Sequence, residues 1–195
     1  MSARTSRDVV VIGASAGGVE ALRTLVSGLP ADLPAAVFVV LHMLPAGRSV
    51  LPEILARTSR LPVQAAEHGA PIERGRIYVA LPDRHLLIDA DRIDLSTDPP
   101  ENLHRPAVDP LFRSAAHAYG ARVVGVVLSG ALDDGAAGLQ TIVENGGGAI
   151  VQTPSDALYP SMPRAALQGS PDAWVVPIAD MAEAVWTMTA EITTP

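Results

Sequence analysis

The sequence predicts an α/β fold in which a mainly parallel, doubly wound sheet is flanked by helices. Short runs rich in valine, such as Val9–Ile12 and Val123–Leu128, are too short for helices and are typical of buried strands. Stretches with apolar residues at helical spacing separate these runs, and glycine-rich turns join them. Strands that alternate with helices favour a parallel sheet covered on both faces, in a three-layer, Rossmann-like arrangement.

The individual elements follow from the same reasoning. Further short apolar runs predict strands at 37–41, 77–81, 86–88, 149–151 and 174–176. Helical spacing predicts helices at 19–28, near 50–55, at 108–119, up to 143–146, at 163–167 and at 178–192. Strand-like runs joined by the turn Pro82–Arg84 predict an antiparallel hairpin near residues 76–95, at a sheet edge or as a flap. The proline-rich stretch Asp98–Ala107 is expected to be a loop.

Length and composition limit the possible functions. The chain has 195 residues and a formal net charge of −7, and it lacks cysteine. We expect one domain over residues 8–192, a short tail over 1–7 and a cytoplasmic protein without a membrane-spanning segment. The acidic balance disfavours nucleic acid as a partner, and the absence of cysteine excludes thiolate chemistry. No histidine pair has metal-ligand spacing on one helix, so neither a metal nor a cofactor is expected.

Ligands of parallel sheets bind beyond the carboxyl ends of the strands, which selects three turns. The first, Gly13–Gly18, lacks the glycine that a dinucleotide fingerprint needs at position 15. It matches the pattern G-x-S-x-G, in which Ser15 would sit on a tight strand-to-helix turn. The alternative is a glycine-rich turn in which Ser15 only caps the next helix, and the pattern alone gives both interpretations about equal weight.

The second and third turns contain a histidine and two acids. Of the five histidines, only His42 directly follows a buried strand. The third turn, Ser129–Gly135, contains Asp133 and Asp134. Either acid could cap the following helix or orient His42, and spacing alone does not choose between them.

The three turns are more informative together than separately. A serine, a histidine and an aspartate at one edge of a sheet are what a nucleophile, its general base and an orienting carboxylate require. Their order along the chain is Ser, His, Asp, whereas α/β-hydrolases have Ser, Asp, His, so that fold is excluded.

Several long motifs resemble the catalytic domain of the CheB family, the protein-glutamate methylesterases of bacterial chemotaxis. The resemblance covers about Asp8 to Val185. The motifs are VVVIGASAGGVEAL at 9–22, LHM at 41–43, YVALPDRHLLI at 78–88, HRPAVDPLFRSAA at 104–116 and SGALDDGAAGL at 129–139.

The resemblance implies a Ser-His-Asp triad of Ser15, His42 and Asp134, which selects Asp134 over Asp133. It also implies hydrolysis of glutamate methyl esters on chemoreceptor cytoplasmic helices, and deamidation of receptor glutamines. The N–H groups near Ala16 and Gly17, at the start of the next helix, are expected to bind the oxyanion. Ala131, where the family usually has methionine, is assigned to the same oxyanion region.

Two departures from the family pattern matter. The family often has threonine at Ala16, and its third turn usually begins Gly-Met-Gly, where this chain has Gly130, Ala131 and Leu132. Family members that are regulated by phosphorylation carry a receiver domain, which needs about 100 residues. Only seven residues precede Asp8, so we expect no regulation in cis and leave open a separate receiver or signalling protein as a partner.

Other interpretations remain. The same triad could serve a serine esterase or amidase acting on another substrate, or the fold could be a non-catalytic binding module. A dinucleotide-binding domain is disfavoured by Ser15 and His42. Arg105 and Arg113 could steer an acidic helix toward the site, although ordinary surface arginines are the favoured interpretation.

Overall fold

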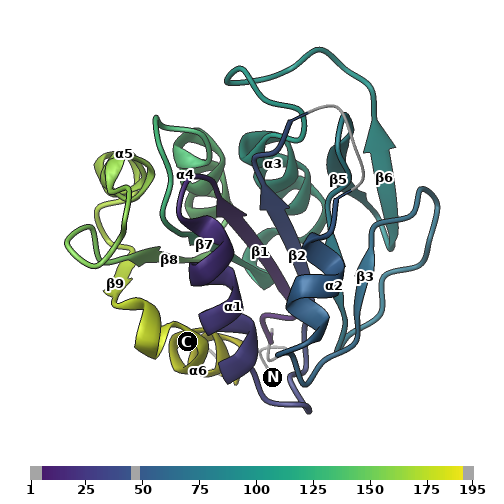
Figure 1. Cartoon of the computed structure of the whole chain (residues 1–195), viewed down its shortest axis with the longest axis horizontal. Coiled ribbons are helices and arrows are strands. Elements are labelled where there is room, and N and C mark those ends of the chain that lie inside the picture. The colour runs from purple at the N-terminus through teal and green to yellow at the C-terminus, as the bar shows by residue number, and fades with distance from the viewer. Residues whose placement is uncertain (1–5, 45–48, 191–195) are drawn as a thin grey trace, which may run out of the picture.

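A computed structural model describes residues 6–44 and 49–190 of the chain. Seven parallel strands form the main sheet in the order β3-β4-β2-β1-β7-β8-β9, and β5 and β6 form a separate antiparallel hairpin (Figure 1). The main-sheet strands are β1 (Val9–Ala14), β2 (Ala36–Leu41), β3 (Val63–Ala65), β4 (Ile77–Val79), β7 (Val123–Val127), β8 (Gly148–Gln152) and β9 (Trp174–Val176). The hairpin strands are β5 (His85–Asp89) and β6 (Arg92–Ser96).

Helices cover both faces of the sheet. They are α1 (Gly18–Gly28), α2 (Leu51–Ala56), α3 (Val108–Tyr119), α4 (Ala136–Glu144), α5 (Ser161–Gly169) and α6 (Met181–Ala190), with short 3-10 turns at Gly120–Arg122 and Ile178–Asp180. No helix in these described parts of the chain is long and apolar enough to cross a membrane.

The core is divided into two layers because side chains alternate along each strand. Val10 and Ile12 pack with residues of α1, α2 and α6, whereas Val9 and Val11 pack with residues of α3, α4, α5 and the hairpin. Figure 1 shows α1 in front of the sheet with α3 and α4 behind it. The three-layer, mainly parallel fold predicted from the sequence is therefore confirmed.

Three details differ from the predicted elements. The predicted strand 77–81 is β4 of the parallel sheet, so the hairpin consists of β5 and β6 alone. The short strand β3 was not predicted. The helix expected over 178–192 begins with a 3-10 turn and continues as α6, and its last two residues lie outside the described residues.

The sheet register places the first two turns next to each other. Ala14 at the end of β1 pairs with Leu41 at the end of β2, and Gly13 pairs with Val127 of β7. The ladder continues beyond the strands, because the N–H of His42 donates to the Ala14 carbonyl at 3.1 Å. The backbone N–H of Ser15 donates in the same way to the Ser129 carbonyl at 3.0 Å. The residues that follow β1, β2 and β7 are therefore held together at one edge.

Candidate active site

Ser15, His42 and Asp134 form one hydrogen-bonded chain at the carboxyl edge of the sheet. Nδ1 of His42 lies 3.0 Å from Oγ of Ser15, and Nε2 of His42 lies 2.6 Å from Oδ2 of Asp134. A carboxylate only accepts hydrogen bonds, so Nε2 carries the proton and Nδ1 is free to accept from the serine hydroxyl. The side chains of His42 and Asp134 are only 5% and 1% exposed. This arrangement is the one in which an imidazole can remove a proton from a hydroxyl group.

The position of Ser15 depends on the glycine turn. Gly17 is the N-cap residue of α1 with φ of 73°, a left-handed conformation that glycine adopts without strain, and no side chain caps this helix. Ser15 is therefore not a helix cap, which removes the alternative explanation for it. Close packing also requires Gly130, because a Cβ there would lie 2.9 Å from Cβ of Ser15 and 2.0 Å from Sδ of Met162.

Asp134 receives several hydrogen bonds in addition to the one from His42. Its Oδ2 accepts from the N–H of Val108 at 2.7 Å, and its Oδ1 accepts from the N–H of Asp109 at 3.0 Å. These are the first amides of α3, so Asp134 caps α3 and not the helix that follows it in the chain. Burial by itself would raise the pKa of Asp134, but these bonds and the His42 bond outweigh it and hold the pKa below its ordinary value. Asp134 is therefore ionised at neutral pH.

Asp133, the other acid of the third turn, is exposed. Its backbone carbonyl accepts from the N–H of Ala136 at 3.1 Å. The structure thus brings Asp134 to His42 and leaves the Asp133 side chain in solvent.

Two residues near the site were not identified from the sequence. Nδ2 of Asn102 donates to Oδ1 of Asp134 and to Oδ2 of Asp109, both at 2.8 Å. The ring of His104 stacks on the ring of His42 with 3.6 Å between centroids and 8° between planes. Nδ1 of His104 lies 2.6 Å from the Asn102 carbonyl and therefore donates to it. Burial, and then the neighbouring His42, lower the pKa of His104.

Only a weak sequence signal points to these contacts. His104 belongs to one of the motifs that carry the family resemblance, but Asn102 lies in a polar loop with no regular periodicity. Their contacts depend on local backbone conformation, because Asn102 and Leu103 have φ of 50° and 68°. Left-handed conformations of non-glycine residues are not visible in a hydrophobic pattern.

The expected oxyanion residues lie at different positions relative to Ser15. Ala16 and Gly17 directly follow it, just before α1, and among the described residues no protein group accepts a hydrogen bond from their N–H groups. Ala131 is exposed and follows Gly130, the residue that packs against Ser15. The next residue, Leu132, has φ of 65°, which costs a leucine about 1 kcal/mol.

The two arginines considered for steering are engaged within the protein. Arg105 pairs with Asp83 and donates to the carbonyls of Thr97 and Asp98 at 2.8 and 3.0 Å. Arg113 pairs with Glu101, with the closer contact at 2.7 Å. Both therefore tie the loop before α3 to the rest of the fold, in agreement with the interpretation as structural surface arginines.

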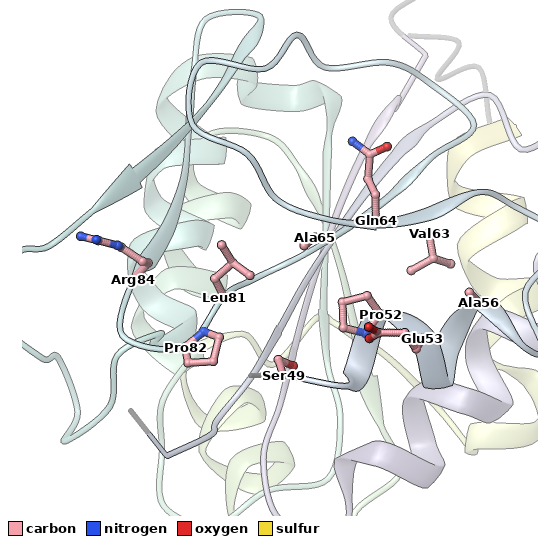
Figure 2. A pocket seen from close by; sticks show the side chains of 10 residues that line it. All are labelled: Ser49, Pro52, Glu53, Ala56, Val63, Gln64, Ala65, Leu81, Pro82 and Arg84. Carbon is pink, nitrogen blue, oxygen red and sulfur yellow. The ribbon is translucent and has the colours of Figure 1, made fainter. Parts of the chain in front are cut away.

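A large cavity lies apart from the triad. It has a volume of about 550 Å³ and is bordered by the start of α2, the strand β3 and the segment after β4 (Figure 2). None of its lining residues belongs to the triad. Across the described parts of the chain, no group of three or more His, Asp or Glu residues is placed to hold a metal ion.

Comparison with known proteins gives a consistent picture. The family model described as CheB methylesterase matches residues 10–185. A protein-glutamate methylesterase/protein-glutamine glutaminase from Anaeromyxobacter dehalogenans is 41% identical over 188 residues, covering 96% of this chain and 55% of that protein. A relative from Leptospira interrogans is 36% identical, covering 90% of this chain and 92% of its own length. The chain thus spans about half of the first relative and nearly all of the second.

A solved structure agrees with the fold. The crystal structure of the Thermotoga maritima CheB methylesterase catalytic domain superposes with a TM-score of 0.89 at 31% sequence identity. The match covers 93% of this chain and 98% of that one.

Proposed function

Because the chain belongs to the CheB methylesterase family, we propose that it hydrolyses glutamate methyl esters on the cytoplasmic helices of chemoreceptors. The same site would deamidate receptor glutamines, in line with the name of the Anaeromyxobacter relative. The observation that carries the proposal is the hydrogen-bonded chain from Ser15 through His42 to Asp134.

The reaction begins with attack by the serine. His42 takes the proton of Ser15 at Nδ1 while Oγ attacks the ester carbonyl, and its Nε2–H bond to Asp134 holds the ring in the tautomer that leaves Nδ1 free. The imidazolium that results is stabilised by the ionised Asp134. His42 then gives the proton to the leaving methoxide oxygen, which departs as methanol, or to the leaving amide nitrogen of a glutamine, which departs as ammonia.

The negative charge that develops on the carbonyl oxygen needs hydrogen-bond donors. The N–H groups of Ala16 and Gly17 lie between Ser15 and the start of α1, an eleven-residue helix whose N-terminal dipole favours an anion. Each such donor is typically worth about 3 kcal/mol in the transition state. Water then attacks the acyl-enzyme, with His42 as the base again, and releases the glutamate carboxylate.

The proposal is tested with receptor membranes that carry labelled methyl esters. Release of labelled methanol that saturates with receptor concentration supports it. If the chain hydrolyses small esters but releases no methanol from receptor, the triad serves another substrate. If it hydrolyses neither, while still binding receptor, the fold acts as a binding module and the proposed reaction is wrong.

A further inference from the structure

Two leucines near the triad have an unfavourable backbone conformation and exposed side chains. Leu103 and Leu132 have φ of 68° and 65°, and their exposed fractions are 86% and 56%. A left-handed backbone is unfavourable for leucine, and an exposed side chain gains nothing from burial. Neither feature is explained by the packing of the protein itself.

Both leucines are close along the sequence to residues that contact the triad. Leu103 lies between Asn102, which donates to Asp134, and His104, which stacks on His42. Leu132 lies two residues from Gly130, which packs against Ser15, and two residues from Asp134. Both leucines therefore belong to the segments that position the triad.

Other exposed apolar residues occur in the same region. Leu158 is 74% exposed, and a Cβ on Gly17 would lie 3.0 Å from its Cβ. The next residue, Tyr159, is 47% exposed, and its carbonyl accepts from the N–H of Gly130 at 2.9 Å. Exposed apolar side chains thus occur in both segments next to the turn that contains Ser15: the third turn, with Leu132, and the segment of Leu158 and Tyr159. Concentrated exposed apolar surface around a site is typical of a binding surface.

We propose that Leu103 and Leu132, the leucine pair, determine substrate specificity by binding apolar side chains next to the ester on a helical substrate. A helix presents residues three and four positions away on the same face as the ester, so those neighbours meet the leucine pair when the ester reaches Ser15. This inference rests on the proposed function and adds to it the feature by which a helical segment is chosen.

The most informative variant is Leu132→Gly. Glycine adopts a left-handed backbone without strain, so this change removes the side chain without harming the fold, and the melting temperature should stay the same or rise. With a soluble fragment of a methylated chemoreceptor, KM should rise about tenfold, because the apolar contact is lost. The ratio of kcat/KM on that fragment to kcat/KM on p-nitrophenyl acetate should fall by a similar factor.

A matched control is Ala90→Gly in the turn between β5 and β6. Ala90 is also exposed and left-handed, with φ of 48°, but it lies outside the catalytic loops. It should show the same effect on melting temperature without a change in KM. If Leu132→Gly and Leu103→Gly both keep the wild-type KM and the wild-type ratio, the leucine pair has no role in substrate binding.

A change in the substrate provides the complementary test. Serine is placed at the apolar positions three and four residues from the ester in the receptor fragment. KM of the wild-type enzyme should rise, and KM of the Leu103→Gly, Leu132→Gly double variant should change much less. Equal increases for both enzymes would contradict the proposal.

The role of the leucine pair and the proposed reaction on chemoreceptors can be tested separately. If wild type releases no methanol from the fragment but hydrolyses p-nitrophenyl esters, the receptor assignment is wrong. The leucine pair is then tested with p-nitrophenyl acetate, butyrate and octanoate. Wild type should hydrolyse the esters with longer acyl chains faster, and the Leu103→Gly, Leu132→Gly double variant should lose that preference. If the double variant keeps the wild-type preference, the leucine pair has no role in binding. Absence of both activities overturns both proposals.

Discussion

Asp109 and Asp134 each cap the helix that belongs to the other. Asp134, which precedes α4, accepts from the first amides of α3, while Oδ1 of Asp109 in α3 accepts from the N–H groups of Gly135 and Gly138 at 3.1 and 2.7 Å. Asn102 donates to both carboxylates. Burial raises the pKa of Asp109, with a further increase from Asp134, whereas the pKa of Asp134 is lowered. These reciprocal capping hydrogen bonds fix the orientation of the Asp134 carboxylate, which contacts His42.

Asn102→Gly tests how much this orientation contributes to catalysis. Glycine tolerates the left-handed backbone at this position, so the variant removes the amide and keeps the loop. A hydrogen bond to a charged group is worth about 1.5–3 kcal/mol, so we expect kcat to fall by a factor of about 10 to 100 with little change in KM. Asn102→Asp should be more harmful, because it places a third carboxylate against Asp134 and Asp109. Wild-type kcat in both variants would show that Asp134 needs no such support.

Asp134→Asn and Asp133→Asn distinguish the two acids of the third turn. Loss of the charge at Asp134 disturbs the tautomer of His42, and kcat should fall by about three to four orders of magnitude. Asp133→Asn changes an exposed side chain and should leave kcat within about a factor of two. The measurement is methanol release by the two purified variants side by side. The assignment fails if the Asp133 variant shows the larger loss.

His104 predicts a pH dependence of stability. Its pKa in the folded protein lies below the ordinary value of 6.5, so between these two values the unfolded chain binds more protons than the folded one. The free energy of unfolding should therefore rise with pH in this window and level off above it. His104→Phe keeps a ring on His42 but cannot be protonated, so its denaturation midpoints between pH 5 and 8 should vary less with pH. An identical slope in wild type and variant would contradict the prediction.

Gly130→Ala tests the packing beneath the nucleophile. The new Cβ would approach Met162 and Ser15 to distances at which something must move, and such overpacking costs about 1–3 kcal/mol. The free energy of unfolding should fall by this amount and kcat should fall with it, because Ser15 is displaced. Gly169→Ala at the end of α5 is the control, since its Cβ would meet only ordinary contacts, the nearest at 3.5 Å. Equal stability of the two variants would show that the turn has spare room.

The sequence predicted those parts of the fold that have strong local patterns. The valine-rich strands beside Ser15 and His42 and the helix α3 were located because burial on both faces and helical spacing are visible in a single sequence. The strand β3 was missed because its three residues are only half-buried. The segment 77–81 was assigned to the hairpin because a strand with turn residues after it gives no information about which neighbour it pairs with.

The same distinction applies to the site. Ser15, His42 and one of two acids could be found because strand ends meet at one edge of a parallel sheet. The contacts of Asn102 and His104 could not be predicted, because they arise where a loop without periodicity folds back over residues far away in the chain. Spacing alone left Asp133 and Asp134 as alternatives, because it carries no information on which side chain of the turn faces the histidine. The family resemblance selected Asp134, which is the acid that contacts His42 in the structure.

Ser15→Ala removes the hydroxyl that we propose as the nucleophile, activated by His42 and Asp134. Labelled methanol release from methylated receptor membranes should be measured for wild type and for this variant, after circular dichroism has shown that both are folded. We expect release by wild type and a loss of about a thousandfold or more in the variant. A folded Ser15→Ala variant that releases methanol within tenfold of the wild-type rate would contradict it.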